Sequence, residues 1–136
     1  MSPVLDASLT LSWYFEDERT EAGDALMTQV AVGGAVVPIL WRYEVANGLH
    51  MAVRRKRVDA AYRDASLADL RRFPITVDRG DDVSIWSATL SLADRFGLTI
   101  YDAAYLELAD RRALPLATRD RALRAAAQAL TIETLG

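Results

Sequence analysis

Four acidic side chains stand at positions where a carboxylate could take part in chemistry. They follow short apolar runs or lie in the first turns of expected helices: Asp6, Glu44, Asp102 and Asp120. In an open parallel sheet, ligand sites gather beyond the carboxyl ends of the strands, which is where Asp6 and Asp120 are expected. If folding brings all four together, their mutual repulsion would raise their pKa values or require a counter-ion. The signal is the set of four and no single acid.

The composition restricts the chemistry that these acids can share. The sequence has no cysteine and one histidine, His50, which excludes a thiol nucleophile, a cysteine-based zinc site and a histidine-rich metal site. His50 lies six positions after Glu44, so the two do not share a helix face, and we expect His50 to be structural or peripheral. Oxygen ligands alone select a hard cation, Mg²⁺ or Mn²⁺, with several waters kept in its shell.

The charged residues disfavour several other classes of protein. A net charge of −3 argues against a strong, permanent coat of nucleic acid. The only lysine, Lys56, falls at the far end of an expected helix, whereas a phospho-acceptor signalling domain or a haloacid-dehalogenase-type phosphatase requires a lysine near its site. The phosphatase would also need an aspartate where Ser8 stands.

Each acid also has a purely structural interpretation. Asp6, Asp102 and Asp120 lie near expected helix N-termini, where a carboxylate caps free backbone amides and complements the helix dipole. Glu44 shares its expected inward face with Asn47, and an unpaired carboxylate buried there would be costly without a partner such as Arg42 or a distant arginine. The alternative function is therefore a non-catalytic α/β interaction module whose acids serve as helix caps.

The elements that must position the acids alternate between short apolar strands and longer helices. Strands are expected at residues 1–6, 35–39, 74–77, 114–117 and 131–135. Helices are expected from Ser8 onward and at residues 21–32, 40–55, 59–72, 81–96, 101–112 and 119–129. This alternation predicts one α/β domain over residues 1–136, with a parallel sheet covered on both faces.

Two further expectations concern burial and location. Residues 81–96 are apolar on more than one face, which predicts a well-buried helix, and the core should hold most of the aromatic side chains Trp13, Tyr14, Phe15, Trp41 and Trp86. There is no apolar stretch of about 18 residues and no basic-then-apolar leader, so we expect a cytoplasmic protein that neither spans a membrane nor carries a signal peptide.

Four sequence blocks carry a family resemblance. They are Val4–Ser8 around Asp6, Glu44–Leu49, Tyr101–Ala109 around Asp102, and Leu116–Leu123 around Asp120. In order and spacing they resemble the motif blocks of PIN-domain nucleases, above all the VapC-type ribonuclease toxins of bacterial toxin–antitoxin pairs. The resemblance covers essentially the whole chain. It implies a three-layer α/β/α sandwich with a central parallel sheet, Mg²⁺- or Mn²⁺-dependent endoribonuclease activity on RNA, a small cognate antitoxin as partner, and a homodimer.

The resemblance also assigns expected roles to individual positions. Asp6, Glu44 and Asp102 match the three main metal-binding and catalytic acids of the family, and Asp120 matches a more variable fourth. Supporting polar positions are matched by Ser8, Asn47 and Thr118. Arg119 departs from the smaller residue of many relatives, and it could contact the substrate phosphate or a nearby acid.

The expected reaction is metal-assisted hydrolysis of an RNA phosphodiester by water. The densest basic run, residues 54–57, has two interpretations. It is either a solvated helix C-terminus, where cations complement the dipole, or a contact to RNA phosphates or to the antitoxin through Arg54 and Arg55. Any exposed part of the aromatic set is the expected docking place for an antitoxin helix.

Overall fold

The centre of the structure is a five-stranded parallel sheet. In the computed structural model, which describes residues 2–136, the strand order is β3-β2-β1-β4-β5. The strands are β1 (Val4–Leu5), β2 (Ala35–Pro38), β3 (Ile75–Asp78), β4 (Leu116–Ala117) and β5 (Thr134–Leu135). The central strand β1 pairs with both β2 and β4, so Val4 lies opposite Val36 on one side and Leu116 on the other. The predicted parallel sheet is confirmed.

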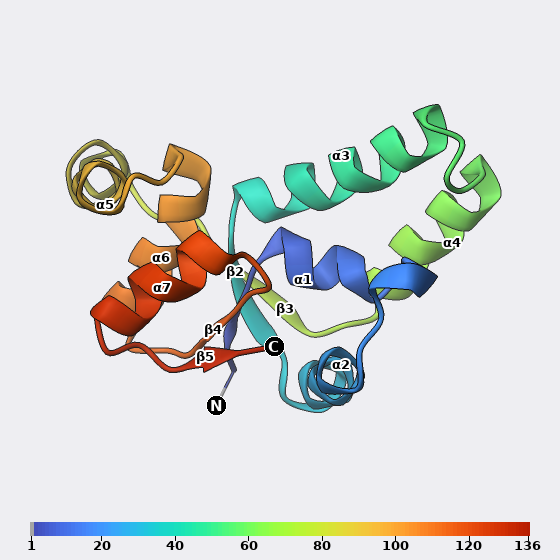
Figure 1. The fold of residues 1–136 in the computed structure, drawn as a ribbon, viewed down its shortest axis with the longest axis horizontal. Coiled ribbons are helices and arrows are strands. Elements are labelled where there is room, and N and C mark those ends of the chain that lie inside the picture. Colours follow the sequence, from blue (N-terminus) through green and yellow to red (C-terminus); the bar gives the residue numbers. More distant parts are fainter. Residues whose placement is uncertain (1) are drawn as a thin grey trace.

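Helices cover the sheet on both sides, as Figure 1 shows. On one side lie α1 (Ala7–Ser12), α2 (Glu21–Gly33), α3 (Leu40–Arg54) and α4 (Ala60–Leu70), with the short 3-10 helix η1 (Glu16–Glu18) after α1. On the other side lie α5 (Leu90–Phe96), α6 (Ile100–Arg112) and α7 (Arg121–Ala129), with the π-helical segment η2 (Ser84–Thr89) before α5. The fold is the expected three-layer α/β/α sandwich.

The core follows from strands that are apolar on both faces. Val4, Leu5, Val37, Leu116 and Ala117 have no exposed surface, as expected for parallel strands packed between two helical layers. Helix α6 contacts β1, β2 and β4, and its long buried stripe fixes where its N-terminus lies relative to the ends of those strands.

The turn between α2 and β2 depends on a glycine. Gly34 has φ +81°, and a Cβ built there would stand 2.6 Å from the Pro74 carbonyl oxygen. Glycine alone tolerates both the left-handed backbone and this close approach of the chain that leads into β3. The residue therefore lets β2 enter the sheet directly beside β3.

The segment expected to be a well-buried helix at residues 81–96 is helical but not well buried. It runs from the π-helical η2 into α5, and Val83 and Trp86 are 75% and 74% exposed. One side of the segment packs on α6, and no other part of residues 2–136 covers the outer side. The remaining aromatic residues of the set, Trp13, Tyr14, Phe15 and Trp41, are buried as expected. Among residues 2–136, no helix has the length and apolarity needed to cross a membrane.

Candidate active site

Asp6 lies at the carboxyl edge of the sheet, where β1 passes into α1. It is 3% exposed, and its Oδ1 accepts the Leu9 backbone N–H at 2.8 Å, so it caps α1. The Ser8 hydroxyl lies 2.9 and 3.0 Å from the two carboxylate oxygens. The Thr118 hydroxyl, just beyond the neighbouring strand β4, donates a short hydrogen bond to Oδ2. Adjacent parallel strands thus bring together two residues that the sequence separates by 112 positions.

The surroundings of Asp6 disfavour the ionised form of its carboxyl group. Burial raises the pKa of Asp6 to about 6, and the nearby negative charge of Asp102 adds to this rise. The hydrogen bonds from Thr118, Leu9 and Ser8 oppose the rise without cancelling it. Asp6 is therefore held firmly in position while its ionised form remains poorly solvated.

Glu44 reaches the same region from the first turns of α3. Its Oε1 accepts a hydrogen bond of 2.7 Å from the hydroxyl of Tyr105, which α6 buries to 1% exposure. Burial raises the pKa of Glu44, and the charge of Asp102 raises it further, against the lowering effect of the Tyr105 hydrogen bond. Among residues 2–136 no arginine forms an ion pair with Glu44, so the structural alternative of an Arg42 partner is wrong.

Asp102 lies in the first turn of α6, but it does not cap that helix. The capping group is the Thr99 hydroxyl, which accepts the Asp102 backbone N–H at 3.1 Å. The Asp102 carboxylate is therefore not engaged in capping. Burial raises the pKa of Asp102, and the charge of Asp120 raises it further. Since the charge of Asp102 also raises the pKa of Asp6 and of Glu44, Asp102 is the acid that links the other three electrostatically.

Asp120 follows β4 and caps α7. Its Oδ1 accepts the Leu123 backbone N–H at 2.8 Å, and its own N–H donates to the Thr118 hydroxyl at 3.0 Å. The capping interpretation thus holds for Asp6 and Asp120 and fails for Asp102. Capping occupies one oxygen of Asp120, which leaves the other without a protein donor among the described residues.

The donor set fits a hard divalent cation. The four acids offer carboxylate oxygens as ligands. Within residues 2–136 no arginine or lysine forms an ion pair with any of them. As the side chains stand in the described chain, no group of three or more acidic or histidine side chains lies close enough to enclose an ion directly. Magnesium keeps several waters and uses only one or two carboxylates directly, so a mixed shell of carboxylates and water reconciles these observations.

The other expected site residues divide into those near the acids and those away from them. Ser8 and Thr118 contact Asp6, as the expected supporting role requires. Asn47 is exposed, so the prediction that it points inward is wrong, although it stands three positions after Glu44 on the same helix face. The buried stripe of α3 runs through Val45 and Leu49, and Asn47 stands about 200° around the helix from Val45.

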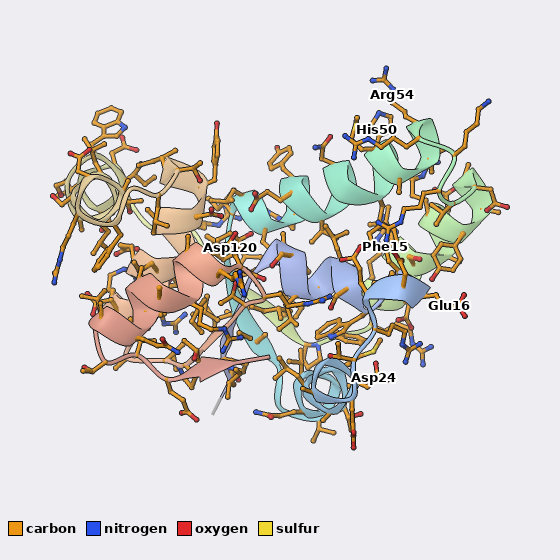
Figure 2. All side chains as sticks on the ribbon, in the orientation of Figure 1. Phe15, Glu16, Asp24, His50, Arg54 and Asp120 are labelled. Atoms are coloured by element: carbon orange, nitrogen blue, oxygen red, sulfur yellow. The ribbon has the colours of Figure 1, made fainter. Side chains whose placement is uncertain are left out.

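The expected basic contacts lie elsewhere in the structure. Arg119 donates to the Glu18 carbonyl oxygen at 2.8 Å, which ties the loop before α7 to η1 and to none of the four acids. Arg54, with Arg55 beside it, ends α3 far from Asp120, and His50 lies on the outer side of the same helix (Figure 2). Of the basic run, Arg57 is paired with Asp17 and Glu18.

Sequence reasoning missed Tyr105. It stands three positions after Asp102 on α6 and so shares that helix face, inside a block already singled out. The signal was a hydroxyl-bearing residue on the stripe that also carries an acid. Its partner Glu44 is 61 positions away, a pairing that spacing alone does not reveal.

A parallel α/β domain with an acidic site beyond its strand ends is the class that this fold and geometry define. The chain belongs to the PIN domain family, whose model matches residues 4–129. It is 31% identical over 123 residues to Ribonuclease VapC3 of Pyrobaculum aerophilum, covering 90% of this chain and 92% of that protein.

Two solved structures share this fold. The crystal structure of PAE2754 from Pyrobaculum aerophilum has a TM-score of 0.72 at 25% identity, covering 93% of this chain and 84% of that chain. FitAcB from Neisseria gonorrhoeae has a TM-score of 0.67 at 16% identity, covering 98% and 96%. This second likeness concerns the fold alone.

Proposed function

We propose that this protein is a divalent-metal-dependent endoribonuclease that acts as the toxin of a toxin–antitoxin pair. The observation that carries the proposal is the position of Asp102. Its charge acts on Asp6 and Glu44, the charge of Asp120 acts on it, and no basic side chain of residues 2–136 pairs with any of the four. The likeness to Ribonuclease VapC3 supports RNA as the substrate.

Asp6, Glu44, Asp102 and Asp120 are the residues that would hold Mg²⁺ or Mn²⁺. When bound, such an ion supplies Lewis-acid stabilisation of the phosphate and a more acidic water. Thr118 and Ser8 orient the carboxylate of Asp6 through their hydroxyls, and Tyr105 orients Glu44. Because water attacks and the ribose 2′-hydroxyl does not, the fragments should carry 5′-phosphate and 3′-hydroxyl ends.

The test is cleavage of RNA by purified Asp102→Asn in Mg²⁺. Asp102 is the acid of choice because its side chain caps no helix, so its replacement should leave the fold intact. We expect at least a hundredfold loss of rate, and Asp110→Asn, an exposed acid on the same helix, is the matched control. Cleavage by Asp102→Asn at the rate of the unaltered protein would remove Asp102 from the mechanism.

A second candidate function has its own support. Asp6 and Asp120 do cap helices, as a non-catalytic interaction module would require. Such a module would cleave no RNA in Mg²⁺ or Mn²⁺, and its stability would not respond to either ion.

The proposed partners are RNA, a small antitoxin and a second copy of this chain. Trp86 on η2 is the only exposed member of the aromatic set in the described residues, and it is where we expect an antitoxin helix to dock. With a longer RNA substrate, Arg54 and Arg55 would contact phosphates away from the acids. A toxin of this kind would act in the cytoplasm.

A further inference from the structure

An apolar pocket opens beside the candidate active site. It has a volume of about 350 Å³ and lies between the starts of α3 and α6 and the turn that follows β3. Its walls are largely aliphatic and include Ile39, Leu40, Ile100 and Leu108.

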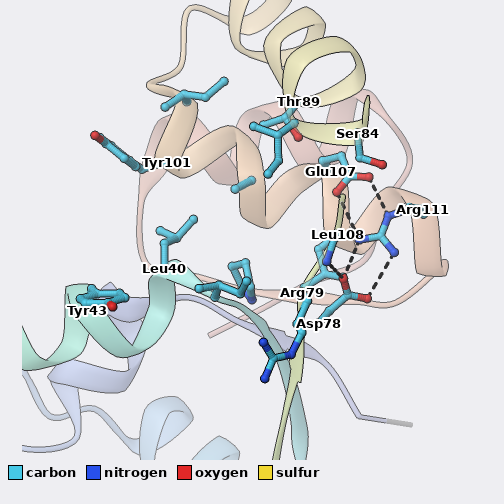
Figure 3. A pocket seen from close by; sticks show the side chains of 16 residues that line it. Leu40, Tyr43, Asp78, Arg79, Ser84, Thr89, Tyr101, Glu107, Leu108 and Arg111 are labelled. Carbon is cyan, nitrogen blue, oxygen red and sulfur yellow. Dashed lines mark hydrogen bonds and ion pairs between the residues drawn. The ribbon is translucent and has the colours of Figure 1, made fainter. Parts of the chain in front are cut away.

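Two exposed tyrosines stand at one end of the pocket. Tyr43 is 75% exposed and Tyr101 is 61% exposed, and both line the pocket. They come from different helices, α3 and α6, and Figure 3 shows them at the same end with Leu40 between them. Each directly precedes a candidate acid, since Glu44 follows Tyr43 and Asp102 follows Tyr101. None of the four candidate acids lines the pocket, but the pocket lies at the starts of the two helices that carry Glu44 and Asp102.

The opposite end of the pocket is closed by a neutralised ion-pair network. Arg111 pairs with Glu107 at 2.7 Å and with Asp78 at 3.0 Å, as the dashed lines in Figure 3 show. These charges satisfy one another, so that end offers no unpaired carboxylate to repel an anion. Arg79, also on the lining, is exposed and forms no ion pair within residues 2–136. Positive charge is therefore available at the rim.

We propose that this pocket binds an unpaired nucleobase of the RNA substrate, with Tyr43 and Tyr101 as its stacking platforms. A nucleobase is flat and aromatic and it stacks on tyrosine, and the other phosphates of the same strand carry the charge that Arg79 attracts. Both tyrosines neighbour candidate acids in the sequence, so a base held there would lie at the starts of the helices that carry Glu44 and Asp102. This inference rests on the proposed function and deepens it.

The shape of this subsite restricts which bases can enter it. A base inside a duplex is stacked and paired, so it cannot enter a side pocket without leaving the helix. Entry into the pocket therefore requires a base that is already unpaired. Aliphatic walls offer few hydrogen bonds to base edges, so stacking strength decides base preference more than a donor and acceptor code.

The experiment uses a short unstructured RNA that carries one 2-aminopurine, with the same strand annealed to its complement as the comparison. Binding and fluorescence are measured in the Asp102→Asn background, which should leave the RNA intact. Cleavage in Mg²⁺ is measured in parallel for each tyrosine variant with Asp102 present. The variants are Tyr43→Ala and Tyr101→Ala, and the Phe variants at both positions retain the ring. Trp86→Ala removes an exposed aromatic residue that lies outside the pocket lining.

We expect each alanine variant to bind the single strand about tenfold to a hundredfold more weakly and to lose the quenching of 2-aminopurine. The phenylalanine variants and Trp86→Ala should bind within about twofold of the parent, because the stacking surface remains. The duplex should bind weakly to all of them.

Three outcomes would overturn the assignment. Alanine variants that bind and quench normally, while RNA cleavage persists in Mg²⁺, would remove the base pocket and leave the proposed function standing. If sedimentation shows that they lose binding only by changing oligomeric state, the pocket belongs to an interface between copies. If the unaltered protein neither binds nor cleaves RNA, the subsite and the proposed function fail together.

Discussion

Two features of the surroundings of Asp6 have opposite effects on its carboxylate. Capping α1 and accepting the Thr118 hydroxyl hold it in place, while burial disfavours its charge. Proteins accept such conflicts at functional sites more often than elsewhere. A bound cation would reconcile the two effects at Asp6.

The raised pKa of Asp6 predicts a pH-dependent stability. Folding moves this pKa from 3.8 to about 6, so the folded state binds more protons between those values. The stabilisation from Asp6 is complete below pH 3.8 and is lost as the pH rises through about 6, up to about 3 kcal/mol for this shift. Asp6→Asn keeps an N-cap without a titrating group. Thermal unfolding in EDTA from pH 4 to 7 should show Asp6→Asn gaining stability relative to the parent as the pH rises; parallel curves would contradict this.

Tyr105→Phe should lower the affinity for the metal ion and leave the stability of the fold largely unchanged. It removes the 2.7 Å hydrogen bond to Glu44 and keeps the buried ring. Losing a group that orients a ligand costs about tenfold to a hundredfold in metal affinity, which calorimetry with Mn²⁺ measures. Tyr14→Phe is a matched control, because the Tyr14 hydroxyl donates to Asp69 at 2.6 Å in another part of the molecule. Equal Mn²⁺ affinity in the two variants would exclude an orienting role for Tyr105.

At this scale the sequence predicts residue types better than contacts. The four acids stood out because of their places before and after apolar runs. The hydrogen bond from Tyr105 to Glu44 and the link from Arg119 to Glu18 join distant segments, and their geometry depends on the finished packing.

At the scale of elements, the junction of α2 and β2 gives a matched pair of substitutions. Gly34→Ala should destabilise the fold by about 2 kcal/mol or more, because its φ is +81° and its Cβ would meet the Pro74 carbonyl oxygen at 2.6 Å. Gly33→Ala should be neutral or stabilising by up to about 1 kcal/mol, since nothing lies within 4 Å of its Cβ. Chemical denaturation of both variants measures the difference, and equal effects would contradict the constraint at Gly34.

Element types were largely readable from hydrophobic spacing, and burial at the edge of the molecule was not. Residues 84–96 are apolar around much of the helix, which would ordinarily indicate a core position. Hydrophobic periodicity identifies the apolar faces of a helix, but it does not show whether another part of the chain packs against them. Trp86 is 74% exposed, so the outer side of this segment is left uncovered within residues 2–136.

For the molecule as a whole, a metal site implies a link between ion concentration and stability. Mn²⁺ at a hundred times its dissociation constant should raise the free energy of unfolding by about 2.7 kcal/mol. Asp102→Asn should show little of this gain, and Asp110→Asn should show all of it. Thermal unfolding with and without Mn²⁺ measures the effect, and an unaltered protein whose melting temperature ignores Mn²⁺ would favour the interaction module.

The overall architecture followed from alternating short apolar runs and helices, but the strand order did not. An order of β3-β2-β1-β4-β5 puts the first strand in the centre, with β4 at its side. That arrangement brings Thr118 to Asp6, and no local pattern in either segment specifies it.

The joining of Asp6 to Thr118 across 112 positions has a consequence for translation. In a nascent chain whose β4 and α7 have not yet left the ribosome, neither Thr118 nor Asp120 is in place beside Asp6. The acidic site therefore forms only after the chain has been made through the start of α7. Any activity of this site is thus excluded until that point of synthesis.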